Sequence, residues 1–310
     1  MITKACAGCC RWQTRRVDPR NARALWHLFE PVHALTYFSP QARQAATDLG
    51  LKGYWAGYVT MRAAPLGHVS AAVVTAAFHG FASARVEKVL PAAWDIVTPQ
   101  AALDSRARAA AAALREVSAA GGITEAHVER AAEVVGAAAA AVDVAGRILG
   151  AANAALRVRE DPYERLWQAT TTLREHRGDG HVAALVSAGI SPVESHLLKI
   201  AAGETPEESL RLGRAWSPEQ WDAGVRSLFT RGWTEGASNG TITLTDTGRA
   251  ARDDVELRTD VAASGPWAAL GAETTAEVTR LLRPVAEAVA ASGVVPFPNP
   301  VGLGWPPPSF

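Results

Sequence analysis

The chain has 310 residues, of which 48% are hydrophobic and 20% are charged, so it is long enough for one large domain or two ordinary ones. This composition excludes a mainly disordered protein. Lys and Arg together number 31, and Asp and Glu also number 31. The chain as a whole therefore has no strong electrostatic attraction for nucleic acid or for an anionic membrane.

The first segment is an N-terminal leader that holds all three cysteines. Cys6, Cys9 and Cys10 lie within ten residues of one another, which rules out a disulfide framework across the fold. The Cys6-x-x-Cys9 spacing is half of a zinc site, but no second pair follows, so we interpret residues 1–20 as a flexible leader. The sequence contains no membrane-length apolar run and no secretory leader, which predicts a cytoplasmic protein that does not use the membrane.

The pattern that follows is helical almost throughout. Residues 21–38 place apolar side chains at helical spacings around Pro31, and Ser39-Pro40 is typical of the start of a second helix. Alanine-rich runs predict long, closely packed helices over residues 101–117 and 124–156. Residues 241–245 alternate with period two and predict a strand, whereas the prolines from residue 296 onward indicate an extended tail rather than a packed element.

An internal repeat organises the chain. Residues 53–60 and 180–187 align at an offset of 127, and the same register carries the pattern Pro-x-x-Trp-Asp from residues 91–95 onto 218–222. Alanine richness does not explain matched tryptophans and prolines. The sequence therefore predicts a degenerate helical repeat over residues 21–157, a winged-helix repeat over residues 158–292, and a Pro-rich tail over residues 293–310.

The second copy shows what the repeated unit is. Three helices are predicted over residues 190–202, 205–212 and 218–231, followed by a hairpin through residue 245 and a helix over residues 248–260. This is the order of a winged helix-turn-helix. The segments 228–233 and 244–249 resemble the recognition-helix end and wing exit of multiple-antibiotic-resistance-type regulators. The predicted fold is thus mostly α, with two diverged winged-helix-type repeats, the second with a small β-wing, joined by long Ala-rich helices.

A winged helix does not by itself bind DNA. Between Glu164 and Asp260, fifteen acidic residues outnumber eleven basic ones, and residues 236–245 hold no basic residue. DNA-binding modules usually cluster Lys and Arg on one face. Contact with phosphate or a guanine edge would fall to Arg226, Arg231 and Arg249, so DNA is a weakly supported partner.

Two polar clusters interrupt the apolar pattern. Spacings of three and four residues bring Glu30, His33 and Tyr37 onto one helix face. Residues 174–181 form a charged segment with two glycines, which we interpret as a flexible junction before the second repeat. The structural alternatives are a hydrogen-bonded cluster that holds a kinked helix and an exposed helix end with a salt bridge.

The duplication predicts a pocket between the two repeats, because ligand sites favour such junctions. The residues that we expect to bind a ligand there are Glu30, Trp55, Tyr58, Arg62, His176, Arg177 and Asp179. If the protein is an enzyme, His181 and His33 are candidate acid–base groups and Tyr37 a proton donor. We predict no cofactor and no metal, although His176 and His181 with Glu30 and His33 form a loosely spaced alternative for Zn²⁺ or iron.

Four segments carry a wider resemblance. Residues 30–38, 62–67, 173–181 and 265–271 are similar to a family of actinobacterial proteins labelled as helix-turn-helix proteins, over about residues 21–284. The resemblance implies a soluble protein, sometimes found in natural-product settings, and transfers no catalytic residue. The leading hypothesis is a small-organic-molecule-binding protein of winged-helix regulator ancestry, monomer or homodimer; a ligand-responsive DNA-binding regulator is one form of this hypothesis. The alternative is an enzyme of specialised metabolism that uses the same pocket.

Overall fold

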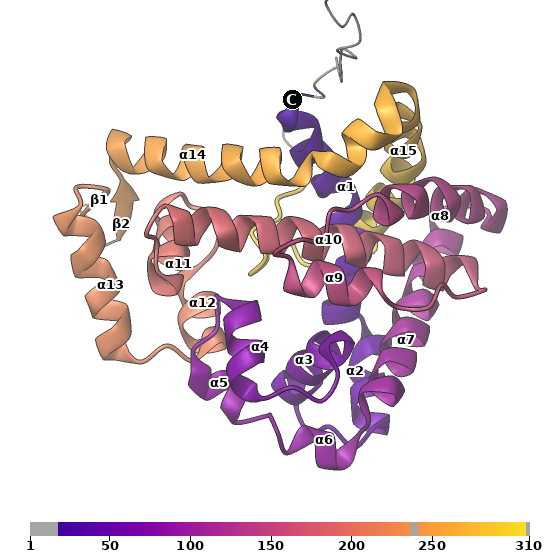
Figure 1. Cartoon of the computed structure of the whole chain (residues 1–310), viewed down its shortest axis with the longest axis horizontal. Helices are drawn as coiled ribbons and strands as arrows, with labels where there is room; N and C mark the ends of the chain where they lie inside the picture. The colour runs from indigo at the N-terminus through magenta and orange to yellow at the C-terminus, as the bar shows by residue number, and fades with distance from the viewer. Residues whose placement is uncertain (1–17, 237–240, 308–310) are drawn as a thin grey trace, which may run out of the picture.

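A computed structural model describes residues 18–236 and 241–307, and within them the chain is built almost entirely of helices (Figure 1). The three cysteines of the predicted leader lie outside the described residues. The elements in chain order are α1 (Pro19–Phe38), α2 (Pro40–Asp48), α3 (Tyr54–Ala63), η1 (Ala64–Leu66), α4 (Ala71–Phe78), α5 (Ser83–Glu87), α6 (Ala93–Ile96), α7 (Pro99–Ala120), α8 (Glu125–Ala140), α9 (Ile148–Ala154), α10 (Pro162–Ser187), α11 (Pro192–Ala201), α12 (Glu207–Arg214), α13 (Pro218–Thr230), β1 (Thr234–Gly236), β2 (Ile242–Leu244), α14 (Asp246–Ala263) and α15 (Gly265–Ala291).

The largest core belongs to a bundle of α1, α7, α8, α10 and α15. Alanines and valines fill much of this core, and small side chains let the helix axes approach closely. Phe29 and Trp267 supply the largest side chains, with ring centroids 6.3 Å apart. Pro31 lies inside α1, as predicted, and Ser39 caps α2 by accepting a hydrogen bond from the Ala42 amide.

Helices α2 to α6 surround a separate core. These helices are here called the first unit. Its last helix, α6, has only four residues, and the extended residues Val97 and Thr98 connect it to α7. At the repeat register α5 aligns with α12 and α6 with the start of α13. Trp94 and Trp221 are both buried, while the duplication itself stays a prediction.

The second unit comprises α11 to α13, the hairpin and the start of α14 around a third core. Ser191 and Ser217 each begin a helix with a capping box, in which the serine accepts from the third residue and that residue's side chain accepts in return. Strands β1 and β2 pair antiparallel, with Thr234 opposite Leu244. These findings confirm the mostly α fold with a small wing in the second half.

Two predicted elements are wrong in detail. The run 124–156 is two helices, because the chain turns at residues 141–147, where the Asp143 carboxylate accepts from the Ala145 amide. Residues 174–181 are not a flexible junction but lie inside the 26-residue helix α10. Gly180 allows close packing, since a Cβ there would lie 2.6 Å from a guanidinium nitrogen of Arg147. That guanidinium donates to carbonyls of both α10 and α14.

The Pro-rich tail is irregular, as predicted, but it packs against the helices. Val295 and Leu303 are each 1% exposed. The Asn299 side chain accepts from the Val301 and Leu303 amides and donates to the Pro296 carbonyl, which stabilises a turn without helix or strand. The apolar partners of the tail lie far from it in the sequence, so a local pattern does not reveal them. The prediction that the tail is not packed was therefore wrong.

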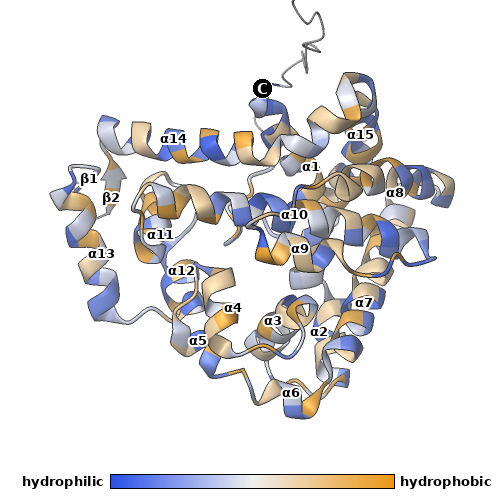
Figure 2. Cartoon of the chain, in the orientation of Figure 1, coloured by the Kyte–Doolittle hydropathy of each residue, from blue (hydrophilic) through white to orange (hydrophobic). Residues whose placement is uncertain are grey.

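Helix α10 holds the three parts together. It runs from the bundle to the second unit beneath α14, with the first unit on its other side (Figure 1). Hydrophilic and hydrophobic residues alternate along α14, which turns only part of its surface toward α10 (Figure 2). No helix within residues 18–236 and 241–307 is long and apolar enough to cross a membrane.

Candidate functional site

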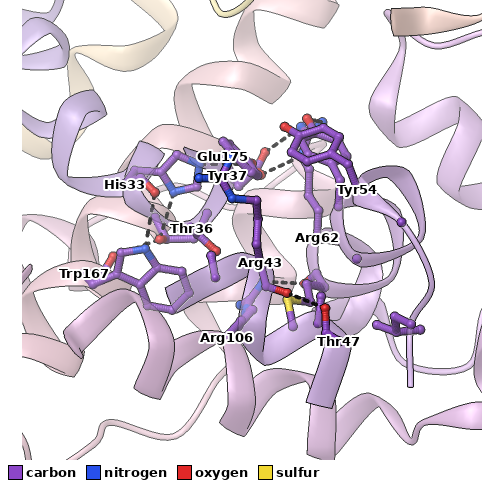
Figure 3. Close-up of a pocket in the computed structure, with 18 residues that line it drawn as sticks. His33, Thr36, Tyr37, Arg43, Thr47, Tyr54, Arg62, Arg106, Trp167 and Glu175 are labelled. Atoms are coloured by element: carbon purple, nitrogen blue, oxygen red, sulfur yellow. Dashed lines mark hydrogen bonds and ion pairs between the residues drawn. The ribbon is translucent and has the colours of Figure 1, made fainter. Parts of the chain in front are cut away.

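A cavity of about 220 Å³ lies between the first unit and the bundle (Figure 3). Helices α1, α2, α3, α7 and α10 supply its walls, together with the segment between α2 and α3, while α11 to α15 supply none. Of the predicted second repeat, residues 158–292, only α10 therefore contributes to this cavity. The lining side chains used below are His33, Tyr37, Arg43, Thr47, Tyr54, Tyr58, Arg62, Arg106, Trp167, Thr171 and Glu175.

A buried ion network forms one side of the cavity. The Arg62 guanidinium donates to both carboxylate oxygens of Glu175, at 2.9 and 3.0 Å. Arg174 also donates to Glu175, at 2.8 Å, and pairs with Glu30 at 3.4 Å. Burial alone would raise the pKa of Glu175, but Arg174 and Arg62 hold it well below its ordinary value. The network therefore remains ionised and fixes Arg62 in place.

A chain of hydrogen bonds crosses the opposite side. Thr171 Oγ1 donates to the Trp167 carbonyl at 2.8 Å, so it accepts from His33 Nδ1 at 3.0 Å. This assignment places the ring proton on Nδ1 and leaves Nε2 to accept from the Tyr37 hydroxyl at 3.1 Å. Burial and the charge of Arg174 lower the pKa of His33 well below its ordinary value, which keeps the imidazole neutral. The Tyr37 oxygen keeps lone pairs free to accept from a ligand.

Tyr58 is a phenol among cations. Its ring centroid lies 4.8 Å from that of Tyr37, and its oxygen accepts from Arg62 at 3.4 Å. Burial raises the pKa of Tyr58, but the charges of Arg62, Arg214 and Arg174 outweigh burial and lower that pKa below its ordinary value. Burial raises the pKa of Tyr37 instead. Two adjacent phenols thus have opposite tendencies, with Tyr58 the better proton donor.

The structure brings four predicted residues together and separates the others. His33, Tyr37, Tyr58 and Arg62 line the cavity, as their helical spacing of four residues allows. Trp55, also predicted to line the ligand site, instead packs at the contact between the two units, where the Arg85 guanidinium stacks 4.7 Å from its ring.

Three further predicted residues line a second, smaller cavity of about 110 Å³ on the other face of α10. Glu30, Arg177 and His181 face it, together with Lys199 and Glu256. Here the His181 Nδ1 donates to Thr259 Oγ1 at 3.0 Å, and burial lowers the pKa of His181 to about 3. His181 and His33 therefore line different cavities, whereas Glu30 and His181 line the same one.

His176 and Asp179 face neither cavity but pack against α9. The Asp179 carboxylate accepts from the Gly150 amide at 2.8 Å, and burial raises its pKa to about 6. Burial lowers the pKa of His176 to about 4. In residues 18–236 and 241–307 no three His, Cys, Asp or Glu side chains converge to hold a metal ion. The alternative metal site at His176, His181, Glu30 and His33 therefore has no matching geometry.

Sequence reasoning missed several lining residues. Thr171 and Glu175 are four residues apart on α10, a spacing that places both on one face once the segment is recognised as helical. Arg106 is a buried cation in an Ala-rich helix, where it donates to the Met61 carbonyl and the Asn153 side chain, each at 2.9 Å. Arg106 lies on the apolar face of this amphipathic helix, unlike the exposed Arg108, and that position is a detectable signal because burying an arginine requires such partners.

The candidate DNA-binding arginines do not form one free face. Arg226 is exposed on α13, and Arg249 is exposed at the start of α14, where it bonds the Leu244 carbonyl. Arg231 instead donates to carbonyls after α10 and to Glu194, and stacks 3.6 Å from the centroid of Trp233. Its guanidinium has a structural role, because it ties the end of α13 to the start of α11.

Helices α11 to α13 with the hairpin define a mostly helical protein of the helix-turn-helix class. The family model described as a helix-turn-helix family matches residues 22–296, and the chain belongs to that family. The match includes the first unit, the bundle and the second unit alike. No curated protein and no solved structure shows significant similarity to the chain.

Proposed function

We propose that this protein binds a small organic molecule in the cavity between the first unit and α10. The observation that carries the proposal is a cavity of about 220 Å³ with aromatic walls on which several buried polar atoms converge. Ligand sites combine a mainly apolar wall with a few fixed polar groups. The volume is below the roughly 300–1,000 Å³ typical of drug-sized ligands, which favours a small molecule.

The polar atoms provide orientation for such a ligand. The Tyr37 oxygen accepts, whereas the Tyr58 hydroxyl accepts from Arg62 and keeps its proton to donate. Both phenols are held by charged or hydrogen-bonded neighbours, so they lose little conformational freedom on binding.

The test is a cavity-blocking variant. Thr47 lies exposed at the edge of the cavity, so Thr47→Trp introduces bulk there without disturbing a core. Native mass spectrometry and thermal shift with host extracts should detect a bound molecule on the wild type and lose it in Thr47→Trp. Thr230→Trp, an exposed threonine on α13, is the matched control and should retain the ligand. Equal binding by both variants would contradict the site.

The hydrogen-bonded pair of His33 and Tyr37 supports a second candidate, an enzyme of specialised metabolism. The neutral imidazole accepts the Tyr37 proton, and Tyr58 beside Arg62 is placed to protonate a substrate. Tyr58→Phe would then abolish turnover of the copurified molecule while changing its affinity by less than about tenfold. Unchanged turnover in this variant would contradict the role of Tyr58 as a proton donor.

A DNA-binding role has less support. The exposed side chains at the start of α13 are Glu219 and Asp222, and Arg231 is engaged within the protein. The helix-turn-helix family makes duplex DNA the partner to test, and only Arg226 and Arg249 of the three candidate arginines remain exposed for it.

A further inference from the structure

The ionised side chains that line the large cavity do not balance. Three arginines, Arg43, Arg62 and Arg106, face a single carboxylate, that of Glu175. Proteins rarely bury charge without a partner, because the desolvation of an unpaired ion is costly. The chemistry of the missing partner follows from which arginines are unpaired.

Arg62 and Glu175 account for each other. Their bidentate contact at 2.9 and 3.0 Å is the strongest geometry available to this pair. Arg174, behind the cavity wall, also pairs with Glu175 but shares Glu30 as a second carboxylate. Two arginines and two glutamates thus form a neutral group. The surplus positive charge lies on Arg106 and Arg43.

Arg106 is the buried member of the surplus. It is 4% exposed and bonds only neutral oxygens, those of Met61 and Asn153, while its Nε has no hydrogen-bond partner. Burial lowers its pKa to about 10, so it remains charged at neutral pH. Among the residues that the structure describes, no carboxylate lies within ion-pair distance of Arg106 or of Arg43. Arg43 is exposed and stands at the edge of the same cavity.

The other titratable groups do not remove this surplus. His33 is neutral, and the Tyr37 phenol is un-ionised at neutral pH. The charges of Arg62, Arg214 and Arg174 lower the pKa of Tyr58 below its ordinary value despite burial, so these cations make the surroundings of the phenol positive. The same surrounding favours any negatively charged ligand over a neutral one of equal shape.

The walls define the rest of the ligand. Rings of Tyr37, Tyr54, Tyr58 and Trp167 line the cavity, and the Arg106 guanidinium lies 5.3 Å from the Trp167 ring centroid. Flat apolar groups pack well on such surfaces. We infer that the ligand of this cavity is a small aromatic monoanion whose charge offsets that of the buried Arg106, while the solvent-exposed Arg43 at the cavity edge adds attraction. This inference rests on the proposed function, since it specifies the ligand class of the same cavity.

The test uses three probes of one shape and different charge: benzoate, benzamide and benzamidine. Calorimetric titration of the full chain should show benzoate binding at least tenfold more tightly than benzamide, with no detectable binding of benzamidine. Arg43→Gln should reduce the benzoate preference about fivefold and weaken its dependence on salt. Arg43 is exposed, so this variant should fold. Arg108→Gln, an exposed arginine on the same helix as Arg106, is the control and should leave the preference unchanged.

The outcomes separate the two proposals. Benzamide binding as tightly as benzoate, with both lost in Thr47→Trp, would overturn the anion inference and leave small-molecule binding in place. Benzoate binding that Thr47→Trp does not affect would place the anion elsewhere and overturn the inference. Failure of all three probes to bind would count against the proposed function and against the inference built on it.

Discussion

The first and second units, which the predicted duplication relates, present different surfaces. At the offset of 127 residues, Tyr58 and Arg62 of the first unit correspond to Leu185 and Gly189 near the end of α10. Tyr58 and Arg62 therefore have no polar counterparts at the predicted repeat register. The second unit instead has the 13-residue helix α13 and the hairpin, where the first has the four-residue helix α6 and no wing.

This difference fits the proposed function, in which the two units have different tasks. In the first unit the chain runs from α6 straight into the bundle helix α7, and α3 packs beside it as a cavity wall. In the second unit α13 ends at the hairpin and keeps an exposed face. A unit built into the bundle can hold small-molecule chemistry rigidly, whereas an exposed unit is suited to contact another macromolecule.

The largest expected effect comes from breaking the ion network at the cavity, compared with an exposed ion pair of the second unit. Glu175→Gln leaves the buried cations Arg62 and Arg174 without their main carboxylate, so we expect a loss of about 3–5 kcal/mol in the free energy of unfolding. Urea denaturation of the full chain measures it. In the second unit, Glu207→Gln removes only an exposed pair with Arg211 and should cost less than about 0.5 kcal/mol. Equal losses would show that the first unit is no more rigidly built than the second.

Trp94 and Trp221, which align at the predicted repeat register, allow the stability of the two units to be compared. Trp221 is 2% exposed and Trp94 is 9% exposed, so Trp→Ala at either position should cost about 3 kcal/mol or more by leaving a cavity. Thermal unfolding of the two variants is the measurement. Phe229→Ala, on the exposed face of α13, serves as the control and should stay within about 0.5 kcal/mol. A wild-type melting curve for Trp94→Ala would argue against a common structural role for the two residues.

The contact between the units should respond to acid. His196 of α11 donates from Nε2 to the Gly80 carbonyl at 2.7 Å, and burial followed by the charge of Arg214 lowers its pKa to about 3. The unfolded histidine binds a proton near pH 6.5 and the folded one does not, so stability falls as the pH drops from about 6.5 toward 4.

His196→Gln keeps a donor but does not titrate, so the slope of unfolding free energy against pH should become shallower by about 1.4 kcal/mol per pH unit in this range. Denaturation midpoints at four pH values would measure the slope. An unchanged slope would mean that His196 titrates normally and that the contact between the units is open to water.

Local patterns predicted most of the fold. The capping residues Ser39 and Ser217, each followed by proline, placed two helix starts correctly, because capping is decided by neighbouring residues. The helix capped by Ser191 was predicted to begin at residue 190, two residues before its observed start. The alternating residues of the wing gave β2 for the same reason. The packed tail escaped prediction because Val295 and Leu303 depend on contacts far away in the sequence.

The site was half predictable for a related reason. His33 with Tyr37, and Tyr58 with Arg62, are pairs four residues apart on single helices, so sequence alone places each pair on one face. Which face of α10 joins them is a matter of tertiary packing. Gly178 and Gly180 were interpreted as flexible, although Gly180 allows Arg147 to pack closely. Because the segment is helical, its side chains point to different faces of α10, and the predicted site residues of this segment do not meet.

The exposed face of α13 gives the smallest expected effect. If this helix enters a DNA groove, Arg226 and Arg249 are the cations available, and each phosphate contact contributes about 0.9 to the slope of log affinity against log salt. Arg226→Ala should therefore make that slope shallower by about one, as measured by fluorescence anisotropy with duplex DNA at several salt concentrations. Arg258→Ala, an exposed arginine paired with Asp254 on α14, is the control. If both substitutions leave the slope unchanged, α13 does not contact DNA through Arg226. The proposal that the second unit uses its exposed face to bind a macromolecule would then lose its support.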